Sequence, residues 1–406
     1  FIDYYIMSSL DSIAWLLNIR GGDINYTPLL FCYVIIPNKG KVELFVNNKK
    51  IKPIAKDIES LVNFHPLNNI NSYINEIKMN KIIGFDEKET SYLFKKICDD
   101  KKLATINLEN PCIYLKAQKN LTEINGAKKA NIRDGASISK FLFWIKNKIS
   151  LEDLDEIKAA QYLLNLRKQN DLFYSPSFDT ISAFGKNAAL PHYRVTKESN
   201  LGFENNNIYL FDSGGQYYDG TTDITRTIIF GKPNNEQKDR FTRVLKGHIS
   251  IAKAQFLIDS KGSSIDHLAR KSLNEIGCDF DHGTGHGIGS FLSVHEGPQR
   301  IVKEQLTDGN IIKEGMILSN EPGFYKKDEY GIRIENLLIC VPNGPDSLKF
   351  ETISWAPFEK DLIDLTLLSL TDIEWINTYH EKVYSHLNKF LSNEENEWLF
   401  MATRPL

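Results

Sequence analysis

The stretch Asp281-His-Gly-Thr-Gly-His-Gly-Ile-Gly-Ser-Phe-Leu-Ser-Val-His-Glu-Gly-Pro298 guides the interpretation of the whole chain. It places His282, His286 and His295 among glycines and contains no lysine or arginine. Glycine lacks a Cβ, so its backbone can approach a ligand closely and adopt a positive φ, at an entropic cost that a purely structural strand would avoid. We therefore expect this loop to carry a binding site.

Two further segments, residues 208–230 and 316–339, carry carboxylates inside runs of β-forming residues. Each has a pair of acids on either side of a turn: Asp212 with Asp223, and Glu321 with Glu335. A carboxylate buried in a strand costs free energy unless its charge is neutralised. A single such acid is more often a solvated turn residue or a salt-bridge partner, but four acids together with one imidazole favour a metal site. Oxygen-rich ligation with one nitrogen suits two divalent cations about 3.5–4 Å apart.

Alternation along the last strand predicts a neighbour for these acids. In residues 331–335, Arg333 and Glu335 fall on one face of the strand, and the two isoleucines fall on the other. Arg333 is therefore predicted to lie beside the carboxylates and to orient them.

The register of the first acid pair stays open. Asp212 and Asp223 would lie directly opposite each other if the hairpin turned at Tyr217-Tyr218. Asp219-Gly220 is the stronger turn signal, however, and a bulge would be needed to reconcile the two.

The five candidate ligands, in this chain order, resemble those of the pita-bread dinuclear metallopeptidases, a family that includes methionine aminopeptidase, prolidase and aminopeptidase P. The strings 219–227, 282–298 and 330–336 are most similar to the cytosolic, three-domain type of aminopeptidase P, and residues 11–21 resemble a segment of its middle domain. That type removes the N-terminal residue from peptides whose second residue is proline. The resemblance covers nearly all 406 residues and implies the same activity and a cytoplasmic location.

The resemblance also implies how the metals are held. Two divalent cations would be bound, manganese as is usual for the family, although zinc or cobalt could occupy the same set. The implied ligands are Asp212, Asp223, His286, Glu321 and Glu335. Glu321 would in addition act as general base on a water that bridges the metals, and the hydroxide would attack the peptide carbonyl.

Four further residues receive roles by resemblance. His282 and His295 would line the substrate pocket without binding metal, and His295 would stabilise the oxyanion. Arg333 would orient the bridging carboxylates. His192 would contact substrate and help to shuttle protons, although from the sequence alone a histidine after a proline in a polar loop is more often a surface residue.

The resemblance implies an α/β fold with two domains. Residues 1–116 would form a non-catalytic, ribonuclease-H-like domain of the creatinase N-terminal type, and residues 117–406 the pita-bread catalytic domain. Because Phe1 leads directly into a strand pattern, we expect the chain to start inside a domain and a preceding N-terminal portion to be missing.

Residues 357–406 are expected to form a C-terminal helical extension. A capping box at 371–374 predicts a helix from there to about Phe390. Its apolar stripe consists of Trp375, Tyr379, Val383 and Leu387. The default is that this stripe packs on the chain's own core; the alternative is a homodimer interface, as the resemblance suggests.

Composition argues against other classes of partner. The net charge of −3 gives no basic field for nucleic acid. The longest apolar run, near residues 29–36, is far short of the ~20 residues that a membrane helix needs. The five cysteines are scattered without CxxC spacing, which indicates reduced thiols rather than a disulfide framework or a zinc site.

Two rival functions remain. The nearer is prolidase, which applies the same chemistry to dipeptides; the Ser-Phe-Leu insertion between His286 and His295 favours aminopeptidase P. The other is a pita-bread binding protein without catalysis. Such a module has no need to bury four acids, so the intact ligand set argues against it.

Overall fold

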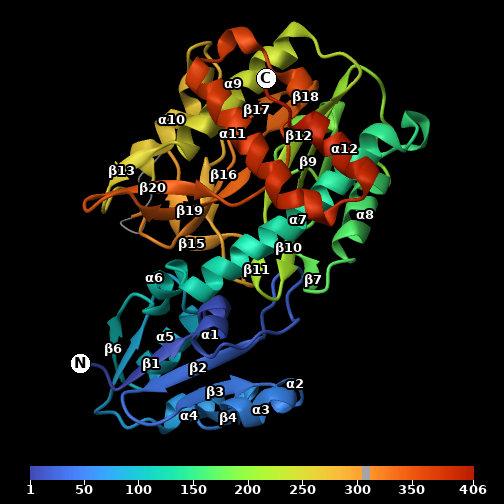
Figure 1. Ribbon diagram of the computed structural model, residues 1–406. Helices are drawn as coiled ribbons and strands as arrows, with labels where there is room; N and C mark the ends of the chain where they lie inside the picture. The colour runs from blue at the N-terminus through green and yellow to red at the C-terminus, as the bar shows by residue number, and fades with distance from the viewer. Residues whose placement is uncertain (304–310) are drawn as a thin grey trace. The chain divides into compact units, whose positions relative to one another are not determined.

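The structure is a computed structural model that describes residues 1–303 and 311–406. The chain divides into two compact units, residues 1–116 and residues 117–406 (Figure 1). Within the described ranges, no helix is long and apolar enough to cross a membrane.

The first unit is built on one mixed sheet. Its strands are β1 (Tyr4–Met7), β2 (Cys32–Pro37), β3 (Val42–Val46), β4 (Val62–Pro66), β5 (Ile82–Phe85) and β6 (Ala104–Asn107), and its helices are α1 (Leu10–Leu16), α2 (Asn48–Ile51), α3 (Ala55–Ile58), α4 (Ile70–Glu76), α5 (Tyr92–Asp100) and α6 (Cys112–Ala117). The strand order is β4-β3-β2-β1-β5-β6. Alternation along β1 sends Tyr5 and Met7 into one buried cluster and Ile6 into another, so apolar cores form on both faces of the sheet.

Over residues 117–303 and 311–406, the second unit combines short sheets with six α-helices. Its strands are β7 (Phe173–Pro176), β8 (Ile181–Phe184), β9 (Asn207–Ser213), β10 (Gly215–Tyr217), β11 (Gly220–Thr221), β12 (Ile224–Phe230), β13 (Gln255–Leu257), β14 (Gly285–Gly287), β15 (Glu296–Ile301), β16 (Ile317–Asn320), β17 (Gly323–Lys326), β18 (Tyr330–Arg333), β19 (Asn336–Pro342) and β20 (Ser347–Thr352). Its helices are α7 (Leu121–Asn147), α8 (Glu156–Arg167), α9 (Asn235–Ala252), α10 (Ser263–Asn274), α11 (Leu370–Leu387) and α12 (Asn393–Ala402). The sheets have the orders β11-β10-β7, β12-β9-β8, β13-β20-β19-β16-β14-β15 and β17-β18.

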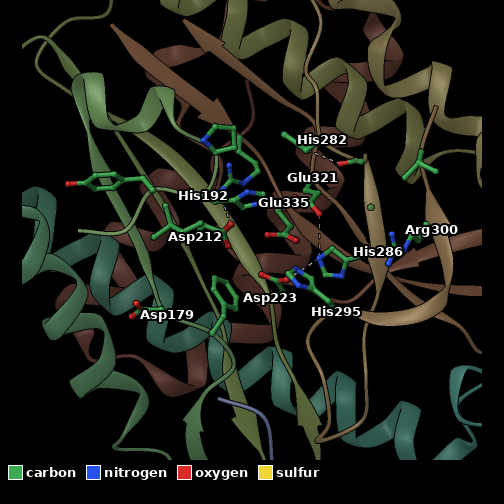
Figure 2. A pocket seen from close by; sticks show the side chains of 18 of the residues that line it. Asp179, His192, Asp212, Asp223, His282, His286, His295, Arg300, Glu321 and Glu335 are labelled. Carbon is green, nitrogen blue, oxygen red and sulfur yellow. Dashed lines mark hydrogen bonds and ion pairs between the residues drawn. The ribbon is translucent and has the colours of Figure 1, made fainter. Parts of the chain in front are cut away.

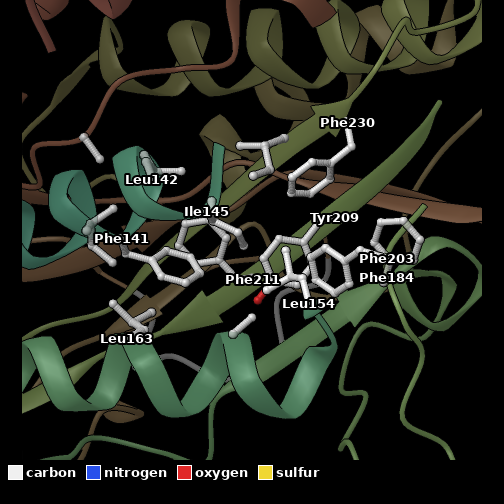
Figure 3. Close-up of a cluster of buried hydrophobic side chains, with 14 of the residues drawn as sticks. Phe141, Leu142, Ile145, Leu154, Leu163, Phe184, Phe203, Tyr209, Phe211 and Phe230 are labelled. Carbon is white, nitrogen blue, oxygen red and sulfur yellow. The ribbon is translucent and has the colours of Figure 1, made fainter. Parts of the chain in front are cut away.

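Helices α7 and α8 pack against the sheet formed by β8, β9 and β12 (Figure 3). Helix α7 begins with a capping box between Asn120 and Glu123. Its Phe141 is fully buried and meets Phe211 of β9 edge to face, with ring centroids 5.0 Å apart. Burying an aromatic side chain of this size contributes about 1.5–3 kcal/mol. This core therefore fixes β9, which contains Asp212, and β12, which Asp223 directly precedes.

The C-terminal extension forms helices α11 and α12. The expected start of the first helix is wrong: its capping box uses Ser369 and Asp372, and the helix begins at Leu370. Three of the four residues of the apolar stripe pack on the chain's own core, because Tyr379, Val383 and Leu387 are at most 4% exposed, whereas Trp375 is only partly buried. The default expectation is confirmed for these three side chains, which are not available as a subunit interface.

Candidate metal centre

Asp212 and Asp223 lie on neighbouring antiparallel strands and face the same side. Asp212 belongs to β9 and pairs with Thr225 of β12, while Asp223 directly precedes β12. Because side chains two residues apart on a strand share a face, Asp223 and Thr225 point the same way as Asp212. The two acids are therefore offset by two residues, and the register that would place them directly opposite each other is wrong.

The segment between the two acids explains this offset. Strands β10 and β11 leave the sheet and form a separate hairpin, in which Tyr217 pairs with Gly220 across a two-residue turn at Tyr218-Asp219. That hairpin pairs with β7 instead of with β8. The turn therefore lies one residue before the stronger of the two signals in the sequence.

His286 lies in β14 between two glycines that touch neighbouring backbones. A Cβ at Gly285 would lie 2.0 Å from the carbonyl oxygen of Ser319, and one at Gly287 would lie 2.2 Å from that of Glu296. Neither glycine has a positive φ. The backbone at these two glycines therefore lies close to neighbouring strands of the protein itself. The expectation of a positive φ at these two positions is wrong.

The imidazole of His286 faces two of the acids (Figure 2). Its Nδ1–H donates to the carbonyl oxygen of Gly287 at 3.0 Å. Its Nε2 lies 3.5 Å from Asp223 Oδ2 and 3.4 Å from Glu321 Oε1. Burial, together with the neighbouring His295, lowers the pKa of His286 to about 3. A neutral imidazole with a free Nε2 is the form that binds a metal.

The remaining acids close the cluster. Glu321 follows β16 directly, and Glu335 lies between β18 and β19. Ligand atoms of Asp223, His286 and Glu335 all lie within 4.8 Å of one another. The structure thus brings all five candidate ligands to one place, where they line the same cavity of about 490 Å³.

Within residues 1–303 and 311–406, the buried carboxylates of the cluster have too few hydrogen-bond donors to neutralise their charge. Asp212 Oδ1 and Asp223 Oδ1 are buried without a hydrogen-bond partner among the described residues. Burial, followed by repulsion from the neighbouring carboxylates, raises the pKa of Asp223 and of Glu335 well above the usual range. Burial also raises the pKa of Glu321 to about 8, although Arg333 opposes this shift. The residues therefore fit two divalent cations, which would neutralise these charges.

Arg333 takes the position that alternation predicted. Its Nη2 donates to Asp212 Oδ2 at 2.7 Å, and its Nη1 donates to the hydroxyl of Tyr325 at 2.6 Å. Thr225 adds a second brace, because its hydroxyl donates to Glu335 Oε2 at 2.9 Å. Tyr325 and Thr225 were not predicted, although both lie at even spacing from an acid, at Glu321 + 4 and Asp223 + 2.

The other three histidines also line the cavity (Figure 2). The hydroxyl of Tyr325 bonds with His282 Nε2 at 2.8 Å, and the rings of His295 and His286 meet at a right angle with centroids 4.3 Å apart. Burial lowers the pKa of His282 to about 4. His192 and His295 are exposed to the cavity.

Other lining residues carry charge but were not predicted as site residues: Asp179, Arg194 and Arg300. Arg300 pairs with His286 across β14 and β15. His248 is fully buried on α9. Its Nδ1 donates to the carbonyl oxygen of Asn320, and its Nε2 accepts from the amide of Asn336, next to two of the candidate ligands.

The chain matches three family models from end to end. The Creatinase/Prolidase N-terminal domain matches residues 2–123, Metallopeptidase family M24 matches residues 125–342, and the C-terminal region of peptidase M24 matches residues 346–406.

Curated relatives of this chain are named as aminopeptidases. Xaa-Pro aminopeptidase 1 of Dictyostelium discoideum is 38% identical over 420 residues, covering 100% of this chain and 66% of its own length. Aminopeptidase P2 of Arabidopsis thaliana is 36% identical, covering 99% of this chain and 62% of its own length. The chain therefore spans slightly less than two thirds of these curated relatives.

Solved structures agree with the fold. The X-prolyl aminopeptidase of Caenorhabditis elegans, described as a cytosolic enzyme with a di-nuclear active site, matches with a TM-score of 0.93 at 35% identity, covering 100% of this chain and 68% of that one. The predicted fold class, a pita-bread domain preceded by a creatinase N-terminal domain, is confirmed by these matches. Since the M24 match at residues 125–342 spans every strand that positions a candidate ligand, the chain belongs to metallopeptidase family M24.

Proposed function

We propose that this chain is a dinuclear metal-dependent aminopeptidase that releases the N-terminal residue from peptides with proline in second position. The observation that carries the proposal is the cluster of four acids and one imidazole on a single cavity, with two buried carboxylate oxygens that lack a hydrogen-bond donor within the described residues. The names of the relatives support the choice of Xaa-Pro peptides as substrates.

The proposed metal ligands are Asp212, Asp223, His286, Glu321 and Glu335. Two bound divalent cations, for which we propose manganese, would lower the pKa of a water and polarise the scissile carbonyl. Glu321 would take the proton of that water. Its Oε1 accepts a hydrogen bond from the hydroxyl of Ser319 at 3.1 Å, and its side chain keeps 18% exposure toward the cavity. The same carboxyl would return the proton to the proline nitrogen as the bond breaks.

The remaining cavity residues would bind and orient the peptide. His295 would donate a hydrogen bond to the oxyanion, because its ring lies beside His286 and is exposed to the cavity. His282 and His192 would hold the Xaa-Pro unit. Arg333 would keep Asp212 in place through the 2.7 Å hydrogen bond. A free amine next to Asp212 would restrict cleavage to the N-terminus of the peptide.

Prolidase remains the second candidate. The Xaa-Pro dipeptidase of Bacillus anthracis matches with a TM-score of 0.72 at 25% identity, covering 88% of this chain and 94% of that one. Hydrolysis of an Xaa-Pro-Xaa tripeptide, the matching Xaa-Pro dipeptide and a proline-free control separates the two functions. Metal-stripped protein should regain activity on the tripeptide when manganese is added. Cleavage of the dipeptide alone would instead identify a prolidase, and no turnover with two metals bound would argue for a binding protein.

We further propose a cytoplasmic homodimer in which residues 1–116 take no direct part in catalysis. The name of the nematode enzyme supports the location. An exposed apolar surface on α11 and α12 supports the assembly, since Leu370 is 85% exposed and Phe400 47% exposed beside a cavity of about 560 Å³. Light scattering on the purified chain tests the dimer, and Leu370→Glu should shift the mass toward the monomer.

A further inference from the structure

Among the proposed substrate-binding histidines, His192 is the one whose imidazole makes neither a hydrogen bond nor a ring contact within the described ranges. The imidazole of His282 is held by its hydrogen bond with Tyr325, and the imidazole of His295 is held by its contact with the ring of His286. His192 lies instead in a long connection between β8 and β9, and it is exposed. Its position therefore depends on how the backbone of this connection is held.

One buried carboxylate holds that connection at four points. Glu156, the first residue of α8, is 0% exposed. Its Oε1 accepts from the backbone N–H of Phe184 at 2.6 Å, and its Oε2 accepts from the backbone N–H of Leu201 at 3.0 Å. These two contacts lie at the two ends of the segment 184–201. Both ends are thus tied to the same side chain.

The same carboxylate also reaches the interior of the segment. The amide of Asn187 donates to Oε1 and Oε2 at 3.0 and 3.1 Å, and the hydroxyl of Tyr193 donates to Oε2 at 3.0 Å. Tyr193 is the residue after His192, and its buried side chain lies in a small apolar cluster with Ile181, Ala183, Ala188 and Leu210. Glu156 therefore fixes the residue beside His192 without lining the cavity itself.

We infer that Glu156 is a positioning residue that holds His192 at the substrate pocket through the segment 184–201. The inference rests on the proposed function, because it takes His192 as a substrate-binding group. A charged carboxylate suits this task, since hydrogen bonds to an ionised acceptor are about twice as strong as neutral ones. A shift of the segment would leave a buried charge without its donors.

Glu156→Gln tests the inference, because glutamine keeps the shape but turns an amide donor toward at least one of these donors. We expect kcat/KM for an Xaa-Pro-Xaa tripeptide to fall by ~10- to 100-fold with metal content unchanged. In a His192→Ala background, the same change should alter kcat/KM by less than about 2-fold, because the group that Glu156 positions is then absent. An equal fold-loss in both backgrounds would overturn the inference.

Asp134→Asn is the matched control. Asp134 is a buried carboxylate that accepts from Arg167 at 2.7 and 3.0 Å and from the Tyr217 hydroxyl at 2.7 Å, and none of these partners lies in the segment 184–201. Its effect on kcat/KM should be the same with and without His192. Tyr193→Phe removes a single donor to Glu156. If Glu156→Gln fails to fold, Tyr193→Phe replaces it in the comparison of kcat/KM with and without His192.

Hydrogen exchange separates this inference from the proposed function. Glu156→Gln should raise amide exchange in peptides from residues 184–201 by ~10-fold or more, whereas Asp134→Asn should not. Unchanged exchange there would refute the anchoring even in a chain that turns over no peptide. Wild-type protein that is inactive on every peptide, yet shows the expected exchange, would refute the proposed function and the role of Glu156 in positioning a substrate-binding group.

Discussion

Removal of the metals should make the stability of the second unit depend on pH through Glu321. Burial raises the pKa of this carboxyl from 4.5 to about 8 in the metal-free fold. Between these values the folded chain holds a proton that the unfolded chain has released, so stability is lost as the pH rises. Between pH 6 and pH 8 the loss amounts to roughly 2 kcal/mol. The 18% exposure of the side chain reduces this figure, and we expect about 1–2 kcal/mol.

Urea unfolding of metal-stripped protein measures this loss. Tryptophan fluorescence reports mainly on the second unit, which contains all the tryptophans except Trp15. Glu321→Gln is the control, because its amide does not titrate while the pH dependence of every buried histidine is retained. The free energy of unfolding of the metal-free wild type should fall more steeply from pH 6 to pH 8 than that of the variant. With metal bound, the wild-type fall should disappear, because ligation keeps the carboxylate ionised. Equal slopes in metal-free wild type and variant would refute the electrostatic account of the cluster.

Three further changes test neighbouring contacts. Asp223→Ala should abolish metal binding, measured by elemental analysis, together with peptidase activity; undiminished activity would exclude the metal mechanism. Tyr325→Phe removes the hydroxyl between Arg333 and His282, and should lower kcat/KM by about 10-fold while both metals are retained. His248→Phe leaves two buried polar groups without a partner and should lower the free energy of unfolding by about 2–4 kcal/mol, whereas an unchanged urea midpoint would show that water or rearrangement replaces those bonds.

Strand periodicity was enough to predict which face of a strand a side chain lies on. It placed Arg333 on the face of the acids, whereas Tyr325 reaches Arg333 from the neighbouring strand β17. The offset between Asp212 and Asp223 could not be found this way, because β10 and β11 pair with β7 rather than continuing the hairpin. Which strand a segment joins depends on distant partners, and local turn chemistry does not specify them.

Contacts between distant segments left no local signal at all. The partners of His248 are 72 and 88 residues away, and those of Glu156 lie 28 to 45 residues away. At the start of α11, two overlapping capping boxes satisfy the same local rule, and only the structure shows that Ser369 is the one used. Local sequence patterns therefore identified the candidate ligands and the cavity histidines more readily than the residues that hold them in place.

A buried charge of each sign holds the two loops that supply His192 and His282. Arg270, paired with Asp266 at 2.7 Å, donates to the carbonyl oxygen of His282 at 2.9 Å, just as Glu156 accepts from the loop of His192. In both cases the loop itself supplies some of the hydrogen bonds that replace those the charged group would make with water. A hydrogen bond to a charged group contributes about 1.5–3 kcal/mol. The loops cannot move away from the pocket without losing that contribution, so the position of each histidine is linked to the stability of the fold.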